Sequence, residues 1–206
     1  MKIFLITVSL LLFFSATTAF AAVGCTLADP DRDVKRLFPE STGYKTEFIS
    51  IAEQGGKALA SEIEEKLGDE LDPIYESLDV PYAYYTILKG KEAIGRIHGV
   101  NQKGLYGGIQ LILATDLEGR IISFYYQRFS SPEAAKFRAL SFTGQFKGLT
   151  LSDFYEQNVV IEDPTGENHN DFKATLRGIK KNLILLDEFM LDKMYDKYYN
   201  EKRSDK

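Results

Sequence analysis

The segment between residues 82 and 129 most constrains the fold, because it contains four strand-like stretches in succession. Each stretch has the length of an ordinary strand and is rich in β-branched and aromatic residues. Two short connections, Gly90-Lys91 and Asp116-Leu117-Glu118-Gly119, are typical of tight turns and predict antiparallel neighbours. We therefore expect an antiparallel meander made of Tyr82–Lys89, Ala93–Val100, Gly107–Thr115 and Arg120–Phe129.

A long amphipathic helix is expected after this sheet, from about Asp171 to Tyr199. Its apolar residues recur at intervals of three and four, namely Leu176, Ile179, Leu183, Leu186, Met190 and Met194. Similar patterns predict shorter helices and one further strand; the helices are Asp29–Pro39, Lys57–Leu67 and Pro132–Phe146, and the strand is Lys45–Ile51. The predicted fold class is α+β, an antiparallel sheet packed by helices, with a long C-terminal helix.

The N-terminus indicates export from the cytoplasm, by one of three routes. Lys2 precedes an apolar run, and Ala19-Phe20-Ala21 has the small-x-small pattern of a signal-peptidase site. Ala22-Val23-Gly24-Cys25 alternatively resembles the lipobox before a lipidated bacterial cysteine. A third alternative is an uncleaved anchor from Ile3 to Val23. All three place the domain in the periplasm, either soluble or attached to the membrane.

Composition excludes several classes of function. Residues 1–24 contain one lysine, so without them the 25 basic residues become 24 against 30 acidic ones, a net charge near −6. Nucleic-acid binding needs a clustered basic face and is not expected. One cysteine and two histidines provide neither a disulfide nor a conventional metal site. No G-x-S-x-G elbow or carboxylate pair indicates a hydrolase, and we assign no catalytic residue.

Several motifs resemble, in their order, those of a known flavoprotein family. They are Gly104-Leu105-Tyr106-Gly107-Gly108-Ile109, Asp116-Leu117-Glu118-Gly119, Gln145-Phe146-Lys147-Gly148 and, at the start of the long helix, Asn170-Asp171-Phe172-Lys173-Ala174-Thr175. Together they resemble the FMN-binding domain found in the C subunit of sodium-pumping NADH:quinone reductase and in the G subunit of the Rnf electron-transport complex. The resemblance covers about residues 95 to 190.

The resemblance implies a flavin site at the start of the long helix. Thr175 would carry FMN through a phosphoester bond, with Ala174 beside it in the attachment motif. Lys173 and the helix start would face the phosphate, because unpaired N–H groups and the helix dipole favour an anion there. Gly107 and Gly108 would border the flavin ring. The protein would then be an electron-transfer component rather than a stand-alone enzyme.

The partners and the FMN-binding-like domain follow from the same resemblance, whereas the N-terminal segment and the charged tail follow from the residues themselves. The partners would be a membrane redox complex or periplasmic electron-transfer proteins, and a flavin transferase would load the FMN. Residues 1–24 would be the signal peptide or anchor, and 25–90 an N-terminal extension of helix, strand, helix and strand. The FMN-binding-like domain would span 91–199, followed by a charged tail at 200–206.

The attachment motif also departs from the family pattern. Phe172 and Lys173 occupy the positions of a serine or threonine and a glycine. Three alternatives therefore stay open. Thr175 can be an ordinary first-turn residue behind an Asn170-Asp171 helix cap. A flavin or another ligand can bind without a covalent bond. The chain can also be a flavin-free accessory or scaffold module that keeps the fold without redox activity.

Overall fold

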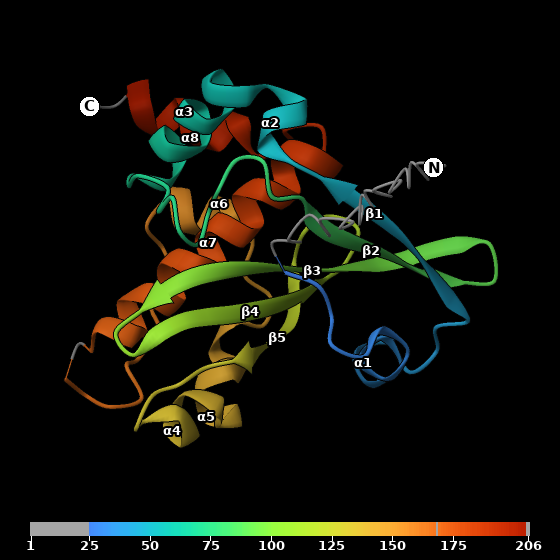
Figure 1. Ribbon diagram of the computed structural model, residues 1–206, viewed down its shortest axis with the longest axis horizontal. Coiled ribbons are helices and arrows are strands. Elements are labelled where there is room, and N and C mark those ends of the chain that lie inside the picture. Colours follow the sequence, from blue (N-terminus) through green and yellow to red (C-terminus); the bar gives the residue numbers. More distant parts are fainter. Residues whose placement is uncertain (1–24, 168, 205–206) are drawn as a thin grey trace, which may run out of the picture.

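The computed structural model describes residues 25–167 and 169–204. It has an α+β fold in which helices pack on an antiparallel sheet, as Figure 1 shows. The predicted signal peptide, lipobox residues before Cys25 and anchor lie outside the described residues. Within the described ranges, none of the helices combines the length and the apolar character that crossing a membrane requires.

The sheet is a five-stranded antiparallel meander in the order β1-β2-β3-β4-β5. The predicted four-strand meander is confirmed as β2 to β5, and β1 adds an edge strand. Gly119 adopts a φ of 82° in the β4–β5 turn, where the Asp116 carboxylate accepts from the backbone N–H of Glu118 and Arg120. The strands are β1 (Gly43–Ile49), β2 (Tyr82–Lys89), β3 (Glu92–Gly104), β4 (Gly107–Thr115) and β5 (Ile121–Arg128).

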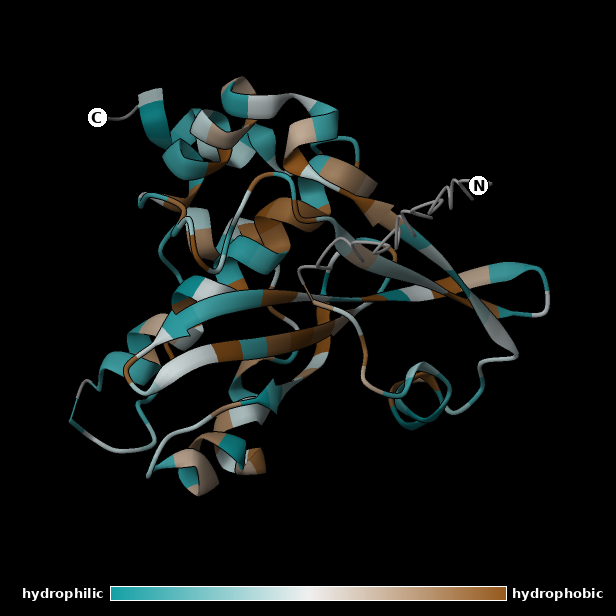
Figure 2. Ribbon diagram, in the orientation of Figure 1, coloured by the Kyte–Doolittle hydropathy of each residue, from teal (hydrophilic) through white to brown (hydrophobic). Residues whose placement is uncertain are grey.

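Each face of the sheet has its own apolar core, because successive side chains of a strand point to opposite faces. In β4, Leu111 and Leu113 join the core under the long helix α7 (Asn170–Met190). Ile112 and Ala114 join the opposite core under α1 (Pro30–Leu37). Figure 2 shows the apolar residues concentrated along the central strands and α7. The predicted long C-terminal helix therefore covers one face.

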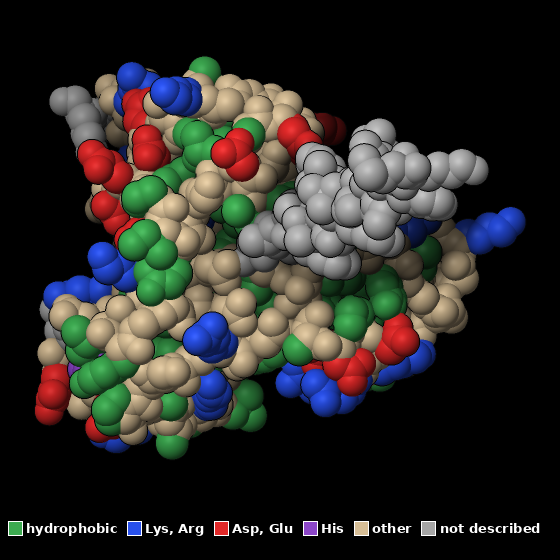
Figure 3. Space-filling model, in the orientation of Figure 1, with side chains coloured by type: hydrophobic (Ala, Val, Ile, Leu, Met, Phe, Trp, Pro, Cys, Tyr) green, Lys and Arg blue, Asp and Glu red, His purple; other side chains and the backbone are tan. Residues whose placement is uncertain are grey.

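Four further helices gather around α7 (Figure 1), and Figure 3 shows charged side chains on the surface that they form. They are α2 (Ile51–Gln54), α3 (Gly56–Leu67), α6 (Leu151–Tyr155) and α8 (Asp196–Ser204). The close approach of α7 to the sheet depends on Gly178, because a Cβ there would lie 2.3 Å from Cδ1 of Leu111. β2 precedes residue 90 and pairs with β3, which follows it. One sheet therefore contains strands from both expected segments, 25–90 and 91–199.

The expected single helix from Pro132 to Phe146 is wrong. The segment forms α4 (Ala134–Arg138), α5 (Leu140–Thr143) and the 3-10 turn η1 (Gly144–Phe146), with extended backbone at Ala139. Phe137 and Phe142 are both buried in the core. On one continuous helix their side chains would point about 140° apart. The break at Ala139 lets both rings reach the core.

The predicted helix from Asp171 to Tyr199 is also interrupted. α7 ends at Met190, and α8 begins at Asp196. Asp192 and Lys193 take left-handed φ values of 51° and 57°, and the Asp187 carboxylate accepts from the backbone N–H of Tyr195 beyond this reversal. Met194, expected in the apolar stripe, is 46% exposed. The side-chain bond from Asp187 thus helps to hold the chain where the helix stops.

Candidate functional site

The structure brings the two flavin-like motifs together at one end of the molecule. The β3–β4 hairpin reaches the start of α7, where the backbone N–H of Leu105 donates to Oδ1 of Asp171 over 2.8 Å. The ring of Tyr106 stacks on His169, with ring centroids 6.5 Å apart. Segments separated by more than 60 residues therefore form one surface.

His169, rather than Asn170-Asp171, caps α7. Its Nδ1 accepts from the backbone N–H of Asp171 over 3.2 Å, and its own backbone N–H donates to Asp163. The carboxylate of Asp171, in the first turn of the helix, is buried. A negative charge is stabilised at that position by the helix dipole. The first turn of α7 already contains an acidic side chain of its own chain.

Thr175 faces the sheet and not the surface. Its side chain is fully buried, and Oγ1 donates to the backbone carbonyl of Asp171 over 2.7 Å. The same Oγ1 lies 2.8 Å from the hydroxyl of Tyr126 on β5. A hydroxyl has one hydrogen, so Tyr126 must be the donor in this second bond. Burial raises the pKa of Tyr126 and keeps it a donor.

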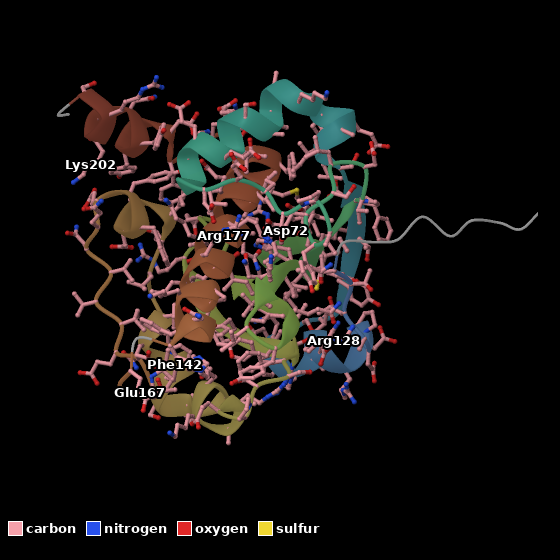
Figure 4. All side chains as sticks on the ribbon, turned by 60° about the vertical axis from the view of Figure 1, so that its left-hand side comes forward. Asp72, Arg128, Phe142, Glu167, Arg177 and Lys202 are labelled. Carbon is pink, nitrogen blue, oxygen red and sulfur yellow. The ribbon has the colours of Figure 1, made fainter. Side chains whose placement is uncertain are left out.

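Lys173 and Ala174 lie on a different side of the helix, where they line an open cleft of about 700 Å³. The opposite wall is the loop that follows α3, and β3 forms the base. Figure 4 shows Arg177 of α7 beside Asp72 of this loop. The remaining lining residues are Gly68, Asp69, Glu70, Leu71, Pro73, Gln102 and Lys103.

The two glycines have structural roles next to this cleft. Gly107 begins β4 with a φ of 115°, a backbone conformation that other residues rarely adopt. A Cβ on Gly108 would lie 2.8 Å from the ring of Tyr75, which leans on the hairpin from the loop. Gly108 pairs in the sheet with Lys103, a cleft residue. Four of the five expected site residues therefore lie at or beside the cleft, and Thr175 does not.

A network of charges holds the base of the cleft. The Arg177 guanidinium donates to Asp69, Glu76 and Gln102, and to the backbone carbonyl of Glu70. Lys181, one helical turn further on, donates to Glu76 and to the carbonyl of Asn101. The side chains of Lys181 and Glu76 are both fully buried.

The pKa values in this network follow from burial and from the neighbours. Burial alone would raise the pKa of Glu76, but Lys181 and Arg177 hold it below its ordinary value. Burial lowers the pKa of Lys181 to about 8, while Glu76 acts in the opposite direction. Both groups are therefore charged at neutral pH.

This network has only a weak signal in the sequence. A basic pair at an interval of four, Arg177 and Lys181, borders the apolar stripe of α7 and was the available signal. Glu76 stands in a loop with no pattern that marks it as buried. A scan against protein-family models and a search of curated proteins gave no match to the chain.

Proposed function

We propose that the chain is a binding or accessory module without covalently attached flavin. The observation that carries this proposal is the position of Thr175. An attachment residue must offer its oxygen to the phosphate of FMN and to the transferase that delivers it. Oγ1 of Thr175 is instead buried between α7 and β5, with hydrogen bonds to Asp171 and Tyr126.

Esterification at Thr175 would be costly in this arrangement. It would remove the hydroxyl hydrogen, so the bond to the carbonyl of Asp171 would be lost. It would also bring a phosphate charge beside that carbonyl and near the buried Asp171 carboxylate. Burying an unpaired charge is strongly unfavourable. The first turn of α7 would have to open before the bond could form.

The cleft beside Lys173 supports a role in binding. Its volume of about 700 Å³ is within the range of small-ligand sites. Lys173 is exposed and makes no ion pair with any residue in the described parts of the chain. Arg177 is held by its acceptors and so stiffens the base. This arrangement suits a small polar ligand with an anionic group placed beside Lys173.

A second candidate is an electron carrier that holds FMN in the same cleft without a covalent bond. The observation that favours it is that Lys103, the sheet partner of Gly108, and the first turns of α7 line one cleft. The FMN phosphate would lie near Lys173, and the ring would lie toward Lys103 and Gly108. The partners would then be a membrane redox complex or periplasmic electron-transfer proteins.

We further propose that the protein works in the periplasm without a lipid on Cys25. The Cys25 side chain is 1% exposed and packs against the sheet, where a Cβ on Gly99 would lie 2.7 Å from Sγ. The next residues are fastened to the sheet, since Leu27 donates to Tyr85 and Gln127 donates to the Thr26 carbonyl. A diacylglyceryl group on Sγ would displace this whole segment, which argues against the lipoprotein route and agrees with either of the other two routes, a cleaved signal peptide or an uncleaved anchor.

The test is co-expression of the full gene with a flavin transferase, followed by denaturing electrophoresis and in-gel flavin fluorescence. We expect no covalent label on the wild type or on Thr175→Ala, while a known carrier domain of the resembled family is labelled in the same cells. A band that is fluorescent in the wild type and absent from Thr175→Ala would overturn the proposal.

Fluorescence titration of the purified protein with FMN separates the two candidates. Quenching that weakens about tenfold in Lys173→Glu, and not in Lys147→Glu, would identify the non-covalent carrier. Lys147 is an exposed lysine that does not line the cleft, so it is the matched control. Absence of quenching in all three proteins would leave the flavin-free module.

A further inference from the structure

One edge of the sheet has no backbone partner on its outer side among residues 25–167 and 169–204. β1 is the first strand in the sheet order, and among the described residues its backbone pairs with β2 alone (Figure 1). Lys45, Thr46, Glu47 and Phe48 line this strand, and Phe48 is 55% exposed despite its apolar ring. Exposed strand edges are templates for pairing with another strand.

The opposite edge of the sheet is different. At the start of β5, the backbone N–H of Ile121 donates to the carbonyl of Leu149, and its carbonyl accepts from the N–H of Gly148. The hydrogen-bonding groups of that edge are thus partly used within the chain. The contrast makes β1 the edge that is open to a further strand.

The residues of β1 are arranged symmetrically about Thr46. Reading outward, Thr46 is flanked by Lys45 and Glu47, and then by Tyr44 and Phe48. If two copies of β1 paired antiparallel with Thr46 opposite Thr46, each Lys45 would stand opposite a Glu47. Each Tyr44 would likewise stand opposite a Phe48. Opposite charges and aromatic pairs are favourable cross-strand neighbours.

We propose that β1 is a dimerisation edge, which pairs with β1 of a second copy of this chain in the register centred on Thr46. The two sheets would join into one continuous antiparallel sheet with two-fold symmetry. Both faces of the joint would be matched, with charge pairs on the face of α7 and aromatic pairs on the face of α1. The exposed ring of Phe48 would be covered by Tyr44 of the other copy.

Sedimentation velocity of the purified product of the full gene, across a range of concentrations, tests the proposal. We expect a reversible monomer–dimer equilibrium in the wild type. Lys45→Glu places two glutamates opposite each other on both sides of the central Thr46 pair and should weaken dimerisation about tenfold. The double variant Lys45→Glu with Glu47→Lys restores opposite charges in the same register, and dimerisation should return. A monomer at all concentrations, or a dimer indifferent to the single reversal, would overturn the proposal.

A cysteine crosslink tests the register. In a Cys25→Ala background, Thr46→Cys places the two new thiols opposite each other at the dyad, within the reach of a disulfide. Thr42→Cys is the control, because in this register the two copies of residue 42 would be about 27 Å apart. Rapid crosslinking of Thr46→Cys alone supports the joint. Equal crosslinking of both variants, or of neither, would contradict it. Melting curves by circular dichroism verify that each variant is folded.

Discussion

Two buried carboxyl groups have pKa values that are shifted in opposite directions: Glu76 below the cleft and Asp187 near the end of α7. Both residues are almost fully buried. Lys181 and Arg177 hold the pKa of Glu76 below its ordinary value. Burial raises the pKa of Asp187 to about 7, and the backbone N–H of Tyr195 only partly opposes this effect.

The difference lies in where the cations are. Glu76 accepts directly from Lys181 and from Arg177. Lys66 lowers the pKa of Asp187 through its charge, but its ammonium forms ion pairs with other carboxylates. These belong to Glu62, Glu188 and Asp196. Burial alone therefore does not determine whether a carboxyl group is charged; the direct contact with a cation does.

The largest effect is expected from removing the charge of Glu76. Glu76→Gln keeps the shape of the side chain but leaves Lys181 buried without its counter-ion. Breaking a buried ion pair in this way costs roughly 3–5 kcal/mol of unfolding free energy. Urea unfolding at pH 7 measures it.

Asp69→Asn is the matched control for Glu76→Gln. It removes the Asp69 carboxylate, which also pairs with Arg177. The Asp69 side chain is 59% exposed. Exposed ion pairs contribute about 1 kcal/mol or less. Similar losses in the two variants would show that the buried and exposed parts of the network are equivalent, contrary to the comparison above.

An apolar substitution on α7 provides a scale for these values. Leu183 is 2% exposed between the two carboxylate regions, and Leu183→Ala should lose roughly 2–5 kcal/mol through a cavity in the core. Met194→Ala, at a 46% exposed position, should change the unfolding free energy by less than about 0.5 kcal/mol. A small loss at Leu183 with an unchanged denaturant slope would mean that α7 does not pack as described.

The pH dependence of stability should reveal Asp187. Its pKa rises from an ordinary value of 3.8 to about 7 in the folded chain, so between these values the folded state holds a proton that the unfolded chain has lost. Its contribution to stability is therefore complete at low pH and is lost as the pH rises toward 7. Asp187→Asn should remove this fall from the unfolding free energies measured between pH 4 and 7.

Glu76 should show the opposite sign. Its folded pKa lies below the ordinary value of 4.5, so its contribution is present above that pH and is lost as the pH falls further. Glu76→Gln should remove the loss on the acid side and leave the fall between pH 4 and 7. If the two variants change the same part of the pH profile, the comparison of the two carboxylates is wrong.

The sequence predicted the sheet and the helices α1, α3 and α7, because turns and apolar periodicity are local signals, whereas the short helices α2 and α6 were not predicted. The four strands from Tyr82 to Phe129 were found for this reason. The breaks at Ala139 and after Met190 were missed, because they depend on packing in the core and on the side chain of Asp187. Local patterns do not record such distant contacts.

The candidate site was predicted less completely than the fold. Motif order led us to expect Gly107, Gly108, Lys173 and Ala174 in one region; Lys173 and Ala174 line the cleft, and Gly108 pairs with the cleft residue Lys103. The direction of Thr175 could not be read from the motif, since it depends on the hydroxyl that Tyr126 presents from β5. Glu76 was not predicted as a site residue for the same reason, because its partners come from a helix about 100 residues further along the chain.

A smaller loss than at Glu76 or Leu183 is expected at Thr175, whose buried side chain makes neutral hydrogen bonds instead of ion pairs. Thr175→Val keeps the volume and removes the hydroxyl, so Tyr126 loses its acceptor in a buried place. The loss should be about 1–3 kcal/mol. Tyr126→Phe removes the donor instead, and Thr175 still donates to Asp171, so its loss should be smaller. With both changes, no hydroxyl of the pair is left unsatisfied, and the combined loss should be less than the sum of the two.

Urea unfolding of the four proteins measures this coupling. Additive losses would mean that the two hydroxyls do not interact, and Thr175 would then be free of the contact that holds it away from the surface.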